Sequence, residues 1–240
     1  MSLPQVVSRE EWLAARKALL AREKEMTRAR DNLNADRRRL PMVRVDKDYV
    51  FEGPAGRASL ADLFEGRHQL VVQHFMFDPS WDEGCQSCSA AVDEVSEGLL
   101  AHLRARDTTF AVVARAPLAK LDAYRERRGW TLPFYSSHGA DFNYDFHVTL
   151  DESVAPAEYN YRPFTEATGP DGSAERPGMS CFVRDGADVF HTYSTFARGT
   201  EQLGGAYAVL DMTALGRQEE WEEPKGRAVH AHDATPDFAE

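Results

Sequence analysis

The most constraining feature of this chain is a pair of cysteines placed between a buried strand and an amphipathic helix. Residues 70–77 read Leu-Val-Val-Gln-His-Phe-Met-Phe, and such a nearly continuous apolar run is typical of a strand covered on both faces. Cys85 and Cys88 follow this run. From there, apolar residues recur at helical spacing along one face: Cys88, Val92, Val95, Leu99 and Leu103. The pattern predicts one helix that begins at the cysteines and buries the side on which Cys88 lies.

This placement indicates a specific chemistry for the two thiols. A cysteine at a helix start lies beside unpaired backbone N–H groups and the positive end of the helix dipole, which favour a thiolate. A second cysteine three residues later can attack a mixed disulfide formed by the first. We therefore predict dithiol–disulfide exchange with Cys85 as nucleophile and Cys88 as resolving thiol. Asp82 and Glu83 precede the motif and oppose thiolate formation, so we do not expect a strongly depressed pKa at Cys85.

Three further residues near the motif are candidates for a supporting role. His74 lies in the preceding strand, where a histidine either tunes the thiols or simply satisfies its ring nitrogens inside the core. Trp81 either covers the cysteines or packs in the core. Arg115 follows a second apolar run, residues 110–114. It therefore points toward the edge of the sheet where α/β proteins bind ligands, unless it only pairs with an acidic neighbour.

Elements beyond the cysteine helix complete the order of a known type of fold. A second helix is expected to begin after Pro117 and to end near Gly129, and two apolar strands flank the turn Asp185-Gly186. A last strand is expected over residues 206–211. Strand, cysteine helix, strand, helix and antiparallel hairpin is the order of a thioredoxin-like core. The predicted fold class is therefore α/β, with a mixed sheet flanked by helices.

The sequence also predicts an amino-terminal helical arm. Residues 8–38 read as helix, and Ser8 with Glu11 forms a capping box at its start. The arm carries a net charge of +4 and the rest of the chain −15. It therefore either docks on the acidic body or remains a solvated helix with ion pairs along its surface. The predicted parts are the arm at 1–41, a thioredoxin-like domain at 42–218 and an acidic polar tail at 219–240.

Several segments together resemble one bacterial family. They include Glu11-Trp12-Leu13-Ala14-Ala15-Arg16, Tyr49-Val50-Phe51-Glu52-Gly53, His74-Phe75-Met76-Phe77, Phe142-Asn143-Tyr144-Asp145-Phe146 and His191-Thr192-Tyr193-Ser194. With the cysteine motif, they resemble the thioredoxin-like family called domain of unknown function 899, whose members are described as predicted dithiol–disulfide oxidoreductases. Gln86 stands where that family commonly has proline, a difference that bears on the reduction potential. The likeness to thioredoxins also implies a cis-proline beside the cysteines, for which Pro177 is the nearest candidate.

Two other functions stay open beside disulfide exchange. The first is a thiol peroxidase, because residues 111–117 resemble the strand-and-helix segment of peroxiredoxins, which makes the expected fold a peroxiredoxin-like variant. Against it, Asp82 stands three residues before Cys85, where their motif has threonine or serine. The second is a non-catalytic scaffold, including one that holds zinc. The two further zinc ligands would be Cys181 and one histidine, either His74, His138 or His191. For disulfide exchange we expect neither a metal nor a cofactor.

Composition narrows the partners and the location. A net charge of −11 disfavours nonspecific binding to nucleic acid, because no excess of basic residues is present to displace phosphate counterions. The longest apolar run is far below the roughly 18 residues of a membrane helix, and the start lacks the features of a secretory signal. We expect a cytoplasmic enzyme acting on a protein or small-molecule thiol or disulfide, without nucleic-acid or membrane partners. The arm packs either on its own domain or on the second subunit of a homodimer.

Overall fold

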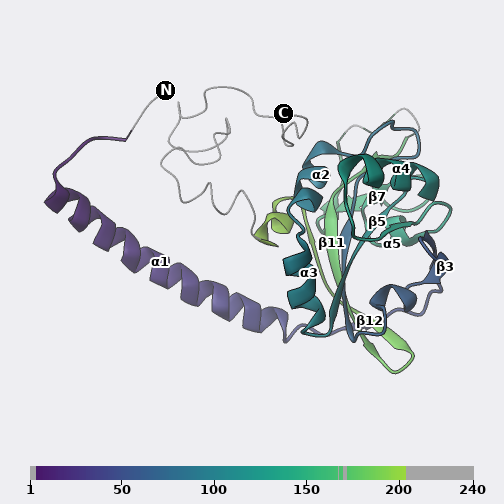
Figure 1. The fold of residues 1–240 in the computed structure, drawn as a ribbon, viewed down its shortest axis with the longest axis horizontal. Helices are drawn as coiled ribbons and strands as arrows, with labels where there is room; N and C mark the ends of the chain where they lie inside the picture. The colour runs from purple at the N-terminus through teal and green to yellow at the C-terminus, as the bar shows by residue number, and fades with distance from the viewer. Residues whose placement is uncertain (1–3, 167, 170–171, 204–240) are drawn as a thin grey trace. The chain divides into compact units, whose positions relative to one another are not determined.

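The computed structural model describes residues 4–166, 168–169 and 172–203 (Figure 1). These residues belong to two compact units, one up to Pro41 and one from Met42 onward. The strand predicted for 206–211 and the acidic tail predicted for 219–240 lie outside the described residues. Within the described ranges, no helix combines the length and the apolar composition that crossing a membrane requires.

The first unit contains one long helix, α1 (Arg9–Arg37). Ser8 fixes its start, because the Ser8 hydroxyl accepts the backbone N–H of Glu11 at 3.2 Å and the Glu11 carboxylate accepts the backbone N–H of Ser8 at 2.9 Å. This reciprocal pair is the predicted capping box, and it satisfies N–H groups that a helix start leaves without partners. No side chain of α1 is buried. Surface pairs such as Arg16–Glu23, at 2.9 Å, therefore support the helix along its length.

In the described part of the second unit, eight strands form one mixed sheet in the order β1-β12-β11-β4-β5-β6-β2-β3. The strands are β1 (Val43–Arg44), β2 (Val50–Gly53), β3 (Gly56–Ser59), β4 (Gln69–His74), β5 (Thr108–Ala114), β6 (Phe134–Ser136), β11 (Gly178–Asp185) and β12 (Asp188–Phe196). Strands β4, β5 and β6 run parallel, whereas β11 pairs antiparallel with both β4 and β12. This mixed sheet with its flanking helices is the predicted thioredoxin-like fold, which is thereby confirmed (Figure 1).

Helices and two short strand pairs complete the second unit. The helical elements are η1 (Asp62–Phe64), α2 (Gln86–Asp93), α3 (Glu97–Arg104), α4 (Leu118–Arg128), α5 (Phe142–Asp145) and η2 (Ala197–Leu203). Outside the main sheet, β7 (Thr149–Leu150) pairs with β10 (Ala174–Glu175), and β8 (Glu158–Tyr159) pairs with β9 (Arg162–Pro163). The two small ladders give order to the Gly- and Pro-containing chain that precedes β11.

Two apolar cores lie on opposite faces of the sheet, as the period-two alternation of strand side chains requires. Leu70 and Val72 of β4 belong to one core, together with side chains of η1 and α5. Phe75, just beyond β4, belongs to the other core, with side chains of α2, α3 and α4. Cys88 of α2 lies in this second core. The cysteine helix is thus fixed to the sheet by the side chains that follow β4.

The structure corrects the prediction of one continuous helix after the cysteines. Helix α2 ends at Asp93, and α3 begins after Ser96, whose hydroxyl accepts the backbone N–H of Leu99 at 3.1 Å. A serine that caps a new helix start in this way interrupts the old one and resets the phase of the buried face. Leu100, with 3% of its surface exposed, is therefore buried, and Leu99 is 38% exposed. The predicted apolar face was therefore wrong at Leu99, whereas Val95 and Leu103, which it also contained, do pack against the core.

These two adjacent leucines provide a test of the reset phase. Leu100→Ala should lower the free energy of unfolding by about 2–5 kcal/mol, because it leaves a cavity in the core. Leu99→Ala, the matched control, should lower it by less than about 1 kcal/mol. Urea unfolding of both variants measures the difference. A larger loss for Leu99→Ala than for Leu100→Ala would show that the two helices are continuous.

Candidate active site

The loop between β4 and α2 presents the cysteines, and neighbouring groups hold it in place. The carbonyl of Met76 accepts the backbone N–H of Cys85 at 3.0 Å. The ammonium group of Lys120, on α4, donates to the carbonyls of Pro79 and Trp81 at 2.8 and 2.5 Å. A cation that bonds to loop carbonyls replaces water as their partner. The residues before Cys85 are therefore fixed relative to α4.

Cys85 and Cys88 occupy the first turn of α2 but have different surroundings. Cys85 is the N-cap residue and is half-buried, whereas Cys88 is only 5% exposed. The hydroxyl of Ser89 donates to the Cys85 carbonyl at 3.0 Å and lies 2.9 Å from the hydroxyl of Tyr124 on α4. The helix start is thus tied to its neighbour, and Cys85 is the more accessible of the two thiols.

The helix start stabilises a thiolate at Cys85. A hydrogen bond with the Cys88 thiol is the largest cause, and bonds with the backbone of Cys88 and with the backbone and side chain of Ser87 add to it. Together they outweigh burial and lower the pKa of Cys85 to about 6. This differs from the expectation that Asp82 and Glu83 prevent a strongly depressed pKa. Both carboxylates are exposed, and water screens their charge more than it screens the bonds inside the helix turn.

Cys88 is shifted in the opposite direction. Its hydrogen bond with Cys85 holds the proton on Cys88, and burial and the charges of Cys85 and Glu175 act in the same sense. The pKa of the Cys88 thiol is therefore raised well above its ordinary value. One helix turn thus holds an ionised, accessible sulfur beside a protonated, buried one.

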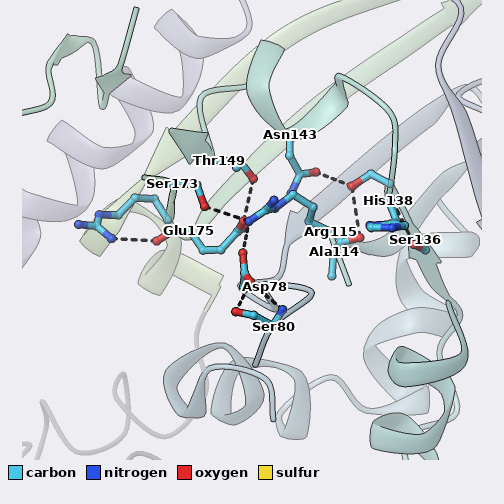
Figure 2. Close-up of polar contacts among 12 residues, drawn as sticks. Asp78, Ser80, Ala114, Arg115, Ser136, His138, Asn143, Thr149, Ser173 and Glu175 are labelled. Atoms are coloured by element: carbon cyan, nitrogen blue, oxygen red, sulfur yellow. Dashed lines mark hydrogen bonds and ion pairs between the residues drawn. The ribbon is translucent and has the colours of Figure 1, made fainter. Parts of the chain in front are cut away.

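A buried ion-pair cluster centred on Arg115 lies next to this turn. Figure 2 shows the Arg115 guanidinium between Asp78 of the cysteine loop and Glu175 of β10. Its Nε donates to Glu175 at 2.6 Å, and Nη2 pairs with Asp78 and donates to the Ser173 hydroxyl at 3.1 Å. The Thr149 hydroxyl donates to the same Glu175 oxygen at 3.0 Å. Arg115, which follows β5, therefore joins the cysteine loop to the chain before β11.

Glu175 is the titratable member of this cluster. Its side chain is 2% exposed, and it shares one cation with a second carboxylate. Burial is the main cause that raises the pKa of Glu175 to about 7, and the charge of Asp78 adds to it, while bonds from Arg115 and Thr149 oppose it. The acidic neighbour predicted for Arg115 is therefore a pair of buried carboxylates, one of which takes up a proton near neutral pH.

Pro177 directly precedes a strand, whereas the sequence placed it several residues before one. β11 begins at Gly178, immediately after the proline, and Gly178 pairs with His74 at the end of β4. The hydroxyl of Tyr159 donates a hydrogen bond to the carbonyl of Pro177 at 2.8 Å. The same hydroxyl oxygen of Tyr159 accepts the backbone N–H of Ala197 at 2.9 Å. Tyr159 was not predicted as a residue of the site, because its two hydrogen-bond partners lie 18 and 38 residues away in the sequence.

The structure does not bring His74 together with the cysteines. Its ring lies 5.5 Å from that of Phe142 of α5, in the core opposite to the one that holds Cys88. Its Nε2 bonds to the hydroxyl of Ser180 at 2.8 Å. Burial is the main cause that lowers the pKa of His74 to about 3, so it is neutral at physiological pH. Of the two predicted alternatives, the placement matches a histidine of the core, but only one ring nitrogen is satisfied, because Nδ1 is buried without a hydrogen-bond partner among the described residues.

The remaining sequence candidates are separated from one another. Trp81 is 37% exposed, so it does not pack in the core. Cys181 lies within β11, paired with Val71 of β4. Among residues 4–166, 168–169 and 172–203, no three His, Cys, Asp or Glu side chains are grouped as metal ligands require.

A thioredoxin-like fold with a Cys-x-x-Cys pair at a helix start defines the class of protein. Within that class, the chain belongs to the family described as "Bacterial protein of unknown function (DUF899)", whose model matches residues 1–235. This confirms the family resemblance seen in the sequence. A search of curated proteins finds no match.

Solved structures similar to this chain include three peroxiredoxin-type proteins. A cysteine mutant of PrxQ from Xylella fastidiosa is 13% identical, with 65% of this chain and 84% of that chain covered and a TM-score of 0.41. Peroxidoxin BcpB from Mycobacterium tuberculosis is 12% identical, with coverage of 64% and 86% and a TM-score of 0.42. A mutant of peroxiredoxin Q from Xanthomonas campestris is 13% identical, with coverage of 64% and 85% and a TM-score of 0.39. Similarities at this level say nothing about the activity of the present chain.

Gly84, directly before Cys85, should be intolerant of a side chain. A Cβ there would lie 2.7 Å from Cζ of Phe75 and 3.2 Å from Tyr124, so Gly84→Ala should lower the free energy of unfolding by about 1–3 kcal/mol. Gly98→Ala in α3 is the matched control, because its Cβ would meet only the Ser96 hydroxyl at 3.7 Å, and it should leave stability equal or higher. Thermal unfolding compares the two, and equal stability of both variants would contradict the packing described.

Glu175 should make stability depend on pH in a defined direction. Its pKa of about 7 in the folded chain exceeds the ordinary 4.5, so its contribution is fully present below pH 4.5 and is lost as pH rises through 7. Between pH 4.5 and 7.5 the native chain should lose about 1–3 kcal/mol of unfolding free energy more than Glu175→Gln does. Urea unfolding at both pH values measures this. Glu166→Gln, at a side chain that is 71% exposed, is the control; the same slope in all three chains would exclude the shift.

Proposed function

We propose that this chain is a dithiol–disulfide oxidoreductase that uses Cys85 as nucleophile and Cys88 as resolving thiol. The partner is a protein or a small molecule that carries a thiol or disulfide. The observation that carries the proposal is the opposite shift of the two thiol pKa values within one helix turn. An exchange catalyst needs one sulfur that is ionised and accessible and one that stays protonated until the first has reacted.

The reaction runs in two exchange steps. The Cys85 thiolate attacks one sulfur of the partner disulfide, which forms a mixed disulfide and expels the other partner sulfur as a thiolate. Cys88 then loses its proton and attacks the Cys85 sulfur, which forms the Cys85–Cys88 disulfide and releases the second partner thiol. Two electrons pass from the cysteine pair to the partner, and the reverse sequence oxidises a partner dithiol.

The loss of charge at Cys85 and the hydrogen bond of Ser89 support this sequence of steps. When Cys85 is in the mixed disulfide, it is no longer charged and no longer holds the proton on Cys88. Both the largest cause of the raised Cys88 pKa and the repulsion by the Cys85 charge are then removed. Cys88 therefore becomes easier to ionise at the stage at which it must attack. The bond of Ser89 to the Cys85 carbonyl keeps the turn in place meanwhile.

We further propose that residues 42–218 form the catalytic domain and that the chain acts in the cytoplasm. In a reducing compartment, a close pair of cysteines serves catalysis more often than structural cross-linking. The amino-terminal arm, residues 1–41, supplies no residue to the cysteine turn in this proposal. Whether the arm packs on its own domain or on a second subunit is tested by comparing the oligomeric state of the full chain with that of a chain without the arm.

The thiol pKa values predict how alkylation depends on pH. Cys85 should react with iodoacetamide with a midpoint near pH 6, because only the thiolate attacks. Cys88 should remain unmodified at pH 7. Peptide mass spectrometry of the reduced chain measures both sites, and the chain denatured in urea is the control in which both midpoints return to about 8.5. A Cys85 midpoint above pH 8 in the folded chain would contradict the assignment.

Replacing the resolving thiol should trap the intermediate. Reduced Cys88→Ser exposed to hydroxyethyl disulfide should accumulate a mixed disulfide at Cys85, whereas the native chain should pass to the internal disulfide. Cys181→Ser keeps both site thiols and should behave as the native chain does. Intact mass measures the adduct. If Cys88→Ser forms no adduct but is oxidised by hydrogen peroxide at Cys85, a thiol peroxidase replaces the present proposal.

A further inference from the structure

Helix α1 carries a stripe of exposed apolar side chains. Trp12, Leu19, Met26 and Leu33 recur every seven residues along it. Each of the four is between 47% and 68% exposed, and no side chain of the 29-residue helix is buried. Helices in proteins are stabilised mainly by packing of their apolar face, and less by helix propensity. The stripe therefore indicates that α1 packs against a partner.

The spacing of the stripe indicates that this partner is another helix. A repeat of seven residues keeps one face of a helix against a second helix in a left-handed coiled coil. The positions three residues after the apolar ones complete the seam, and they hold Ala15, Arg22, Ala29 and Asp36. Two of these side chains are small, which lets two helix axes approach closely, and two carry opposite charges. The partner must therefore offer apolar side chains and one charge of each sign at matching places.

A second copy of α1 that runs antiparallel to the first meets these requirements. Arg22 and Asp36 lie seven residues on either side of Ala29. A two-fold axis at Ala29 therefore brings Arg22 of each copy opposite Asp36 of the partner subunit. The same axis brings Met26 to within one residue of Leu33 of the partner subunit. The seam is thus complementary to itself in both apolar contacts and charge.

Charge disfavours the parallel arrangement of the same two helices. A parallel pair in register would place Arg22 against its own copy and Asp36 against its own copy, and like charges in the seam oppose association. Among the residues that the structure describes, Arg22 forms no ion pair, and Asp36 pairs with Arg39 where both side chains are more than 70% exposed. A surface pair of this kind is weak, so Asp36 can exchange it for a contact with Arg22 of the partner subunit.

Side chains that flank the seam add to the preference for the antiparallel pair. Arg16, Glu23, Arg30 and Arg37 each follow a seam position by one residue. In the antiparallel pair, Glu23 of each copy faces Arg37 of the partner subunit, while Arg30 lies near the axis and faces its own copy. Two attractive contacts therefore stand against one repulsive contact. Arg16 pairs with Glu23 of its own helix at 2.9 Å and needs no further partner.

We propose that the chain forms a homodimer through an antiparallel coiled coil of two α1 helices, with the two-fold axis at Ala29. The overlap covers residues 19–40 of each copy, so that Leu19 lies within one residue of Leu40 of the partner subunit at each end. Trp12 lies outside this overlap. The partner of the amino-terminal arm is thus the arm of a second subunit, and this assignment is independent of the proposed disulfide exchange.

Charge reversal at the two polar seam positions tests the dimer. Sedimentation equilibrium of the full chain at physiological ionic strength should show a dimer. Arg22→Asp and Asp36→Arg should each weaken dimerisation by about tenfold, because each turns both seam ion pairs into repulsive contacts. An equimolar mixture of these two variants should recover the native affinity as a heterodimer, because each chain then supplies the charges that the other needs.

Lys24→Asp is the matched control. Lys24 lies two residues after Arg22, about 200° around the helix and away from the seam, and its reversal changes the net charge by the same amount. This variant should dimerise as the native chain does. A native chain that stays monomeric, Arg22→Asp that dimerises as well as the native chain, a mixture that recovers no affinity, or an equal loss in Lys24→Asp would each overturn the assignment.

Discussion

The pairing of the half-buried Arg115 guanidinium with two buried carboxylates is the interaction on which the geometry of the candidate active site depends. It holds Asp78, in the loop that leads to the cysteines, and Glu175, in the chain that leads to Pro177 and β11. Removing the cation would leave two buried carboxylates with no opposite charge, which is far more costly than losing a surface ion pair. The cysteine loop, the end of β5 and the chain before β11 are therefore fixed as one unit.

The start of α2 then produces the difference between the two thiols. The hydrogen bond with the Cys88 thiol and the N–H groups of the first turn stabilise charge on Cys85. The same turn places Cys88 inside the core, where the bond with Cys85, burial and Glu175 oppose its ionisation. One local feature thus accounts for the difference between the two thiols that the proposed exchange requires, without any further basic side chain. Because Glu175 also contacts Arg115, the cluster that positions the loop also contributes to the pKa of Cys88.

Local patterns in the sequence were sufficient to predict much of this arrangement. The apolar run before the cysteines, the capping box of Ser8 and the hairpin turn at Asp185-Gly186 each depend on near neighbours, and each appears in the structure. The break before α3 was missed although Ser96 is a residue type favoured at N-caps over helix interiors, because the apolar spacing on either side of it was given more weight. Pattern alone favoured the continuous helix.

Contacts between distant segments were not predictable in the same way. Arg115 was expected to meet an acidic neighbour, but its partner Glu175 lies 60 residues away and is selected only by the sheet order. The face on which His74 lies follows from the register of β4, which a fully apolar strand does not reveal. The same holds for a chain of hydrogen bonds from His74 through Ser180 and Ser194 to His191, which joins three strands through side chains that look unrelated in sequence.

The most direct test of the central claim is the reduction potential of the Cys85–Cys88 pair. The fraction of oxidised pair, read by alkylation and mass shift across glutathione and dithiothreitol buffers, reports it. A reversible two-electron transition within about −120 to −270 mV, the range of known exchange catalysts, is the predicted result. Thiols that show no transition in any buffer, or that stay unreactive throughout, would contradict dithiol–disulfide exchange at this site.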